Sequence, residues 1–294
     1  MKILSFGEIL FDIIEGEHYL GGAPLNFTAH AARLGAQAYI LSRLGQDDLG
    51  QEAMQKISSL KVNTSLVQWD EQHPTGTVPV SFEKGQPSYI ITENVAYDFI
   101  SYDKSASQIE STTFDVLYFG TLAQRNAQSA DALAKLVSRN TFREIFYDIN
   151  LRKDCYNADM IRNSLKYCTI FKLNDEEVNV LAEMFYNQPM EIEAFTKKIT
   201  SDFQIGLIVI TAGAKGCYVY QNSELHFVKG YPAKVVDTVG AGDAFSAAFL
   251  IFFLQQGNAL RAADKANRLG AFVASSRGPQ PVYTEEIRNQ LAIS

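Results

Sequence analysis

The feature that most constrains the fold is a regular alternation of short apolar segments with amphipathic ones. Helical spacing appears at Leu49, Ala53, Ile57 and Leu60, and again over 130–137 and 176–185. Strand, helix, strand in this order predicts an α/β fold with a mostly parallel, doubly wound sheet, which binds ligands at the carboxyl ends of its strands. The expected strands, rich in β-branched and aromatic residues, are 2–6, 38–42, 115–119, 144–149, 169–173 and 207–211.

One segment, 75–100, breaks this alternation. Val78, Val80 and Phe82 alternate with other residues, and a turn at 84–87 leads into a second alternating run at 88–92. The pattern predicts an antiparallel hairpin with one solvent-facing side, either a lid or a simple edge hairpin. Since no long linker interrupts the chain, we expect one domain over 1–294.

Composition excludes several functions. Lys and Arg total 26 against 33 Asp and Glu, a net charge of −7, which argues against nucleic acid or an anionic membrane as partner. The longest apolar run, 247–254, is shorter than the ~20 residues that cross a bilayer. The start of the chain predicts a strand and no signal peptide, and Cys155, Cys168 and Cys217 are widely spaced, as for free thiols. We expect a cytoplasmic protein.

A glycine-rich turn before an apolar helix is the sharpest local motif. Gly240, Ala241 and Gly242 precede Asp243 and a helix expected to reach Leu254. Such a turn lets backbone N–H groups converge, and the helix N-terminus adds partial positive charge, which suits phosphoryl oxygens. An acidic residue in a first helical turn is also favoured whatever its function. Asp243 is therefore a catalytic carboxylate or a helix-capping one.

A second glycine cluster, at 21–26, precedes a helix expected over 27–34. Its Asn26 offers both a donor and an acceptor, as hydroxyl recognition requires, although an Asn near a helix start is also a common cap. Asp12 is expected at the carboxyl end of the first strand, in a site or in an exposed loop.

Two further motifs follow predicted strands. Asn174 and Glu177 stand three residues apart, and could hold a hydrated Mg²⁺ or simply begin a helix. Thr211, Gly213 and Gly216 lie where phosphates or ribose could approach, but neither a P-loop nor a dinucleotide fingerprint is present. The second absence argues against a nicotinamide-dependent oxidoreductase. The four histidines are scattered, so no metal-binding or Ser-His-Asp pattern emerges.

Together these stretches resemble the PfkB (ribokinase-like) family of carbohydrate kinases. Residues 21–28, continued by Gly35 and Gly45, look like the family's N-terminal pattern, and residues 237–250 look like its C-terminal pattern. The Asn174 and Thr211 motifs also match, and the resemblance runs from the first strand to about Pro281. It implies a three-layer α/β/α sandwich with a mostly parallel doubly wound sheet, and a β lid from about 13–20 and 75–100.

The implied activity is transfer of the γ-phosphoryl group of ATP to a sugar hydroxyl. ATP and Mg²⁺ are the implied cofactors, and the family pattern allows a monovalent cation such as K⁺. By this resemblance Asp243 is the general base and Gly240, Ala241 and Gly242 form the anion hole. Asp12, Gly22 and Asn26 match sugar contacts, Asn174 and Glu177 match positions serving Mg²⁺ and phosphate, and Thr211, Gly213, Gly216 and Asn267 lie near the nucleotide.

Several stretches look like bacterial fructokinases within this family. They are 6–12, 75–78, 120–125 and the Asp-x-Asn-x-Arg pattern at 148–152, in which Arg152 would meet phosphate or be a surface cation. The usual Ala-Trp-Asp is Ala96-Tyr97-Asp98 here, which leaves the sugar open. We expect D-fructose, with ribokinase, 2-keto-3-deoxygluconate kinase, nucleoside kinase and a catalytically silent sugar-binding regulator as alternatives. The expected partners are a small sugar and ATP, and a homodimer through the lid is compatible with the pattern.

Overall fold

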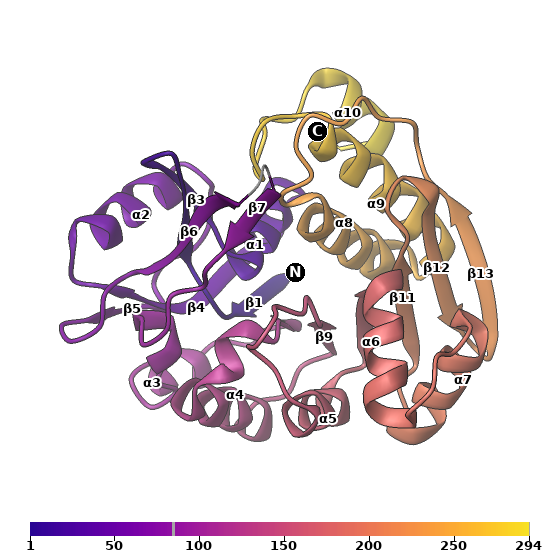
Figure 1. Cartoon of the computed structure of the whole chain (residues 1–294), viewed down its shortest axis with the longest axis horizontal. Coiled ribbons are helices and arrows are strands. Elements are labelled where there is room, and N and C mark those ends of the chain that lie inside the picture. The colour runs from indigo at the N-terminus through magenta and orange to yellow at the C-terminus, as the bar shows by residue number, and fades with distance from the viewer. Residues whose placement is uncertain (84–85, 294) are drawn as a thin grey trace. The chain divides into compact units, whose positions relative to one another are not determined.

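The computed structural model describes residues 1–83 and 86–293 and divides the chain into two compact units, Met1–Phe142 and Arg143–Ser294 (Figure 1). Each unit contains parallel strands joined through helices, as the alternating pattern predicts. Among the described residues, no helix combines the length and apolar character needed to span a membrane. All three cysteines are free thiols, as expected.

The first unit is centred on β1 (Lys2–Phe6), which pairs in parallel with β4 (Gln37–Gly45) and β8 (Val116–Phe119). A fourth parallel strand, β5 (Val67–Asp70), pairs with β4. Apolar side chains from α1, β4 and α2 form a buried cluster that includes Leu25 and Ile57. The helices of this unit are α1 (Ala23–Arg33), α2 (Asp48–Ser58), α3 (Ala106–Glu110) and α4 (Ala127–Arg139), with 3₁₀ turns η1 (Ala96–Phe99) and η2 (Leu122–Arg125).

A second, four-stranded sheet in this unit has the order β3-β2-β6-β7. β2 (Leu10–Ile14) pairs antiparallel with β3 (Glu17–Gly21) and parallel with β6 (Gly76–Glu83). β6 and β7 (Gln86–Tyr89) form the antiparallel pair that the alternating pattern predicts, although β7 begins before the expected residue 88. Two residues of the predicted turn, 84 and 85, lie outside the described residues.

The second unit has the strand order β13-β12-β11-β10-β9. β9 (Glu144–Asp148), β10 (Ile170–Asn174) and β11 (Leu207–Thr211) are parallel, and β12 (Gly216–Gln221) and β13 (Glu224–Lys229) continue the sheet antiparallel. The neighbouring helices α8 (Ala241–Gln256) and α9 (Ala259–Ala274) pack against each other (Figure 1). The remaining helices are α5 (Ala158–Tyr167), α6 (Asp175–Tyr186), α7 (Ile192–Phe203) and α10 (Glu285–Leu291), with the 3₁₀ turn η3 (Gly213–Lys215).

Two expectations about element bounds are wrong near the first glycine cluster. α1 begins at Ala23 and not at residue 27, because Gly22 is already the N-cap and Pro24 fits the first helical turn. Asp12 lies in the middle of β2, since β1 ends at Phe6 and the chain then starts a strand of the second sheet. In that sheet Asp12 is in register with Tyr19 and Val78.

Candidate functional site

The start of α1 gathers the three residues expected to contact a sugar. Gly22 has φ 105°, and a Cβ there would lie 2.5 Å from the carbonyl oxygen of Glu8, so another residue would be both strained and overlapping. Asn26 is buried and its backbone N–H donates to the Gly22 carbonyl at 2.9 Å. The Asp12 carboxylate lies close by, since a Cβ on Gly21 would be 3.1 Å from its Oδ2.

The start of α8 is a second glycine-capped helix end. Gly240 has φ 77°, and a Cβ there would lie 2.4 Å from Cβ and 2.7 Å from Cα of Pro279. Asp237 braces the preceding loop, because its carboxylate accepts N–H groups from Val239 at 3.0 Å and Gly278 at 3.2 Å. Asp243 is half-buried in the first helical turn. The segment from Asp237 to Gly240 is therefore fixed at one end by the hydrogen bonds of Asp237 and at the other by the close approach of Pro279 to Gly240.

These two helix ends differ from most others in the chain. The N-cap residues of α1 and α8 are the glycines Gly22 and Gly240, which have no side chain to cap the helix. By contrast, the N-cap side chains of α2, α4, α5, α6, α9 and α10 accept a backbone N–H: Asp47, Asn126, Asn157, Asn174, Asn258 and Thr284. A glycine N-cap offers no side-chain acceptor to the first-turn N–H groups, and at α8 the Ala241 N–H donates to the Thr238 carbonyl oxygen at 3.2 Å. α8 is 16 residues long, so its N-terminus carries a full helix dipole.

A buried ion pair lies beneath the first turn of α8, and the sequence patterns did not single it out. Lys172 Nζ is 3.0 Å from Asp148 Oδ1, and both side chains are at most 8% exposed. Ser246 Oγ, on α8, is placed to donate to Asp148 Oδ2 at 2.8 Å, and it also lies 3.0 Å from the Gly242 carbonyl oxygen. The available signal was a lysine inside the otherwise apolar run Ile-Phe-Lys-Leu.

The carboxylate of Glu177 joins three segments. Its Oε2 accepts the Asn174 N–H at 2.8 Å, its Oε1 accepts the Leu151 N–H at 2.8 Å, and Asn174 Oδ1 accepts the Glu177 N–H at 2.7 Å. This is a reciprocal capping box, which is the helix-start alternative considered for these residues. Burial raises the pKa of Glu177, although the charge of Lys172 opposes that shift.

The Mg²⁺ expectation can be tested against these donors. The Asn174 side-chain oxygen and both Glu177 oxygens already accept backbone N–H groups, so they do not form an open pair of ligands. No group of three or more His, Cys, Asp or Glu side chains able to hold a metal occurs in the described part of the chain. These donors therefore favour the helix-start role over direct metal ligation, and a hydrated Mg²⁺ held through water stays a prediction.

The residues expected near the nucleotide follow β11 or lie on α9. Thr211 is opposite Asn174 in the parallel register, so these two predicted residues do share one sheet edge. Gly213 begins η3 and Gly216 begins β12. Asn267 is buried on α9 and donates to the carbonyl oxygens of Val228 at 3.1 Å and Lys229 at 3.3 Å, which ties α9 to β13. Arg152 is exposed.

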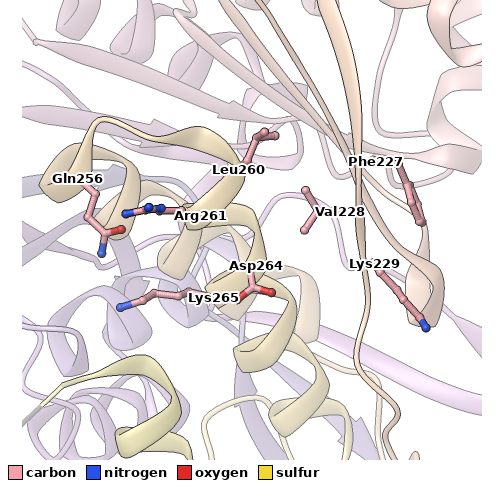
Figure 2. Close-up of a pocket in the computed structure, with 8 residues that line it drawn as sticks. All are labelled: Phe227, Val228, Lys229, Gln256, Leu260, Arg261, Asp264 and Lys265. Carbon is pink, nitrogen blue, oxygen red and sulfur yellow. The ribbon is translucent and has the colours of Figure 1, made fainter.

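A pocket lies between β13 and α9, lined by Phe227, Val228, Lys229, Gln256, Leu260, Arg261, Asp264 and Lys265 (Figure 2). The ammonium groups of Lys229 and Lys265 point in opposite directions (Figure 2), and Lys265 Nζ donates to the Leu291 carbonyl oxygen at 2.5 Å. Asp264 is paired with Tyr231 and Arg268. The walls of this pocket contain none of the predicted site residues.

Comparison with known proteins shows which class of protein has this fold. The structure of an uncharacterized sugar kinase from Pyrococcus horikoshii in complex with ATP superimposes with a TM-score of 0.78 at 27% identity, covering 95% of this chain and 94% of that one. By sequence that relative is 29% identical over 297 residues, 94% of this chain and 91% of its own length. A fructokinase of Vibrio cholerae O395, solved with fructose, ADP and calcium ion, has a TM-score of 0.81 at 24% identity, covering 95% and 94%.

The fold is thus the ribokinase-like α/β fold with a mostly parallel central sheet, as expected. Residues 3–286 match the family described as pfkB family carbohydrate kinase. This chain belongs to the PfkB family of carbohydrate kinases. A curated relative, the fructokinase of Escherichia coli, is 25% identical over 302 residues, 94% of each chain.

Proposed function

We propose that this carbohydrate kinase transfers the γ-phosphoryl group of ATP to a hydroxyl of D-fructose. The observation that carries the proposal is the glycine-capped start of α8, with Asp243 in its first turn. The sugar is supported by the full-length similarity to the Escherichia coli fructokinase and by the fructokinase-like stretches of the sequence. ATP as donor is supported by the Pyrococcus horikoshii relative, which was solved with ATP.

Asp243 is the proposed general base. A sugar hydroxyl is a weak nucleophile at neutral pH, so its attack is helped by a carboxylate that accepts its proton. The new bond joins the sugar oxygen to the γ-phosphorus, the bond to the β,γ-bridging oxygen breaks, and ADP leaves. Backbone N–H groups of Gly240, Ala241 and Gly242 would stabilise the charge on the transferring group. Mg²⁺ would enter the site with the triphosphate of ATP and would neutralise part of its charge.

Sugar recognition is assigned to the start of α1. Asp12 would accept sugar hydroxyls, Asn26 would offer a donor and an acceptor, and Gly22 would let the backbone approach the ligand. Since Asp12 lies on β2 itself, the second sheet carries part of this proposed site. We therefore keep that sheet as the proposed lid, which would exclude water from the acceptor. Pairing of two copies through the lid stays a prediction.

The nucleotide side is assigned to Thr211, Gly213, Gly216 and Asn267, and Arg152 is proposed to meet phosphate charge. Asn267 would act by holding β13 to α9, because its amide already donates to two carbonyl groups. Asn174 and Glu177 would act by fixing the start of α6 and the backbone at Leu151. Their proposed contribution to Mg-ATP is thus indirect.

A coupled ADP-release assay over hexoses, pentoses, 2-keto-3-deoxygluconate and nucleosides, with Mg-ATP and with or without K⁺, tests the proposal. D-fructose should give the highest kcat/KM. A tenfold preference for ribose, 2-keto-3-deoxygluconate or a nucleoside would reassign the acceptor within the family. Absence of turnover with every acceptor, together with sugar binding in calorimetry, would favour the silent regulator.

A further inference from the structure

The ion pair beneath the anion-binding turn is the strongest feature that the proposed function does not use. In β10, Lys172 is opposite Asp148 in the parallel register, and their side chains meet at 3.0 Å. A Cβ built on Gly242 would lie 3.5 Å from Lys172 Nζ, so the ammonium group packs directly against the turn that precedes Asp243. Sequence position alone would not have placed β10 against the start of α8.

A continuous chain of contacts links this ammonium group to α8. Lys172 pairs with one oxygen of Asp148, and the other oxygen accepts the hydroxyl of Ser246. Ser246 lies one turn beyond Gly242 and is also within 3.0 Å of the Gly242 carbonyl oxygen. Both oxygens of Asp148 are thereby used to fix the position of the first helical turn.

The charges around Lys172 give it a second effect. Burial alone would lower the pKa of Lys172, but the carboxylates of Asp148, Glu177 and Asp243 raise it, which keeps the ammonium group charged. Without that cation, three carboxylates would remain on this side of a turn proposed to receive a phosphoryl anion. Like charges at such a site would raise the energy of the transferring phosphoryl group in the transition state.

We propose that Lys172 is a positioning residue for phosphoryl transfer, which holds the Gly240–Gly242 turn through Asp148 and Ser246 and supplies its buried positive charge. The inference rests on the proposed role of this turn. It assigns Lys172 no contact with sugar or nucleotide. Removing it should therefore slow the transfer step more than it weakens substrate binding.

The first test is Lys172→Met, measured with Mg-ATP and the best acceptor of the panel. We expect kcat to fall at least about tenfold, equivalent to ~1.4 kcal/mol of lost transition-state stabilisation, while both KM values change less than about threefold. In calorimetry, ADP affinity should change less than about threefold, and affinity for ADP with aluminium fluoride and sugar should fall at least about tenfold. The control Ile199→Ala, in a buried position of α7, should lower stability and leave kcat unchanged.

The double variant Lys172→Met/Asp148→Asn tests whether turnover falls because the Lys172 charge is lost or because an unpaired Asp148 carboxylate is left behind. It removes the carboxylate that would otherwise be left without its cation, and the oxygen of the new amide could still accept the Ser246 hydroxyl. The double variant therefore also carries the test if the single variant does not fold. We expect its kcat to stay at least about tenfold below wild type. Recovery to within about threefold would overturn the proposal, as would a wild-type kcat in Lys172→Met. Failure of the proposed function is distinct, because it would appear as retained turnover in Asp243→Asn.

Discussion

Replacing Gly240 with alanine tests how strictly the turn before Asp243 is defined. At φ 77° an alanine costs roughly 1–2 kcal/mol because its Cβ crowds the following carbonyl group. The new Cβ would also lie 2.4 Å from Cβ and 2.7 Å from Cα of Pro279, and such overpacking costs about 1–3 kcal/mol. Gly257, at the other end of α8, provides the matched control. It has φ 65°, and a Cβ added there would meet no described atom within 4 Å outside its own helix and its chain neighbours.

The two variants should therefore differ by the overlap with Pro279 alone. Denaturant unfolding should show Gly240→Ala less stable than Gly257→Ala by about 1–3 kcal/mol, with both below wild type. Gly257→Ala should keep its kcat, whereas Gly240→Ala should lose about 100-fold, because a displacement of about 1 Å at a reacting centre can cost that much. Equal losses of stability, or a wild-type kcat in Gly240→Ala, would refute the claim that this turn is rigidly held for transfer.

Further variants test individual side chains. Asp243→Asn should lower kcat about 10²–10⁴-fold with little change in Mg-ATP affinity, and more than a tenth of wild-type turnover would return Asp243 to a helix-capping role. Asp12→Ala should raise the sugar KM, and an unchanged KM would remove Asp12 from the sugar site. Glu177→Gln should lower the free energy of unfolding by about 1–3 kcal/mol, because the new amide nitrogen would face a backbone N–H donor. The Mg²⁺ dependence of turnover should stay unchanged in this variant. A shifted Mg²⁺ dependence would instead support Glu177 as a metal ligand. Burial raises the pKa of Asp70, but hydrogen bonds from the N–H groups of residues 72 and 73 and the charge of Arg43 outweigh it, so the pKa is lowered overall. The stability that this carboxylate adds to the fold is therefore complete above the unfolded value near 3.8, and it is lost as the pH falls through the folded value. Asp70→Asn should therefore be less stable than wild type at pH 7, and this difference should shrink as the pH is lowered below 3.8, as thermal melts over that range would show. A difference that stays constant with pH would contradict this.

The sequence predicted the elements whose periodicity is unambiguous. The strands expected at 2–6 and 207–211 have the observed bounds, and the others differ by a few residues. These strands are buried in the sheet, and burial on both faces requires a nearly continuous run of apolar residues, which is easily recognised in the sequence. A glycine-rich start of an apolar helix was also predicted, although α8 begins at Ala241, so only Gly240 of the three small residues precedes it.

Two features lay beyond the sequence for different physical reasons. The placement of Asp12 depended on where β1 ends, and a short apolar run around a glycine is compatible with one strand or two. The ion pair of Lys172 with Asp148 joins residues 24 apart in the chain, and its relevance comes from α8, a further 98 residues from Asp148 at Ser246. Periodicity reports burial within one element, not which elements meet.

The net charge of the chain gives no indication of this buried cation, because it is a sum over all residues and does not say where each charge lies. A chain of net charge −7 cannot attract an anion through its bulk field. A local site must supply the attraction, and the proposed source is the start of α8, where backbone dipoles add partial positive charge. The same turn must also hold Asp243, whose negative charge opposes the anion. In the role proposed for it, Lys172 would offset this repulsion without occupying the ligand's space, since it approaches from the sheet side of the turn.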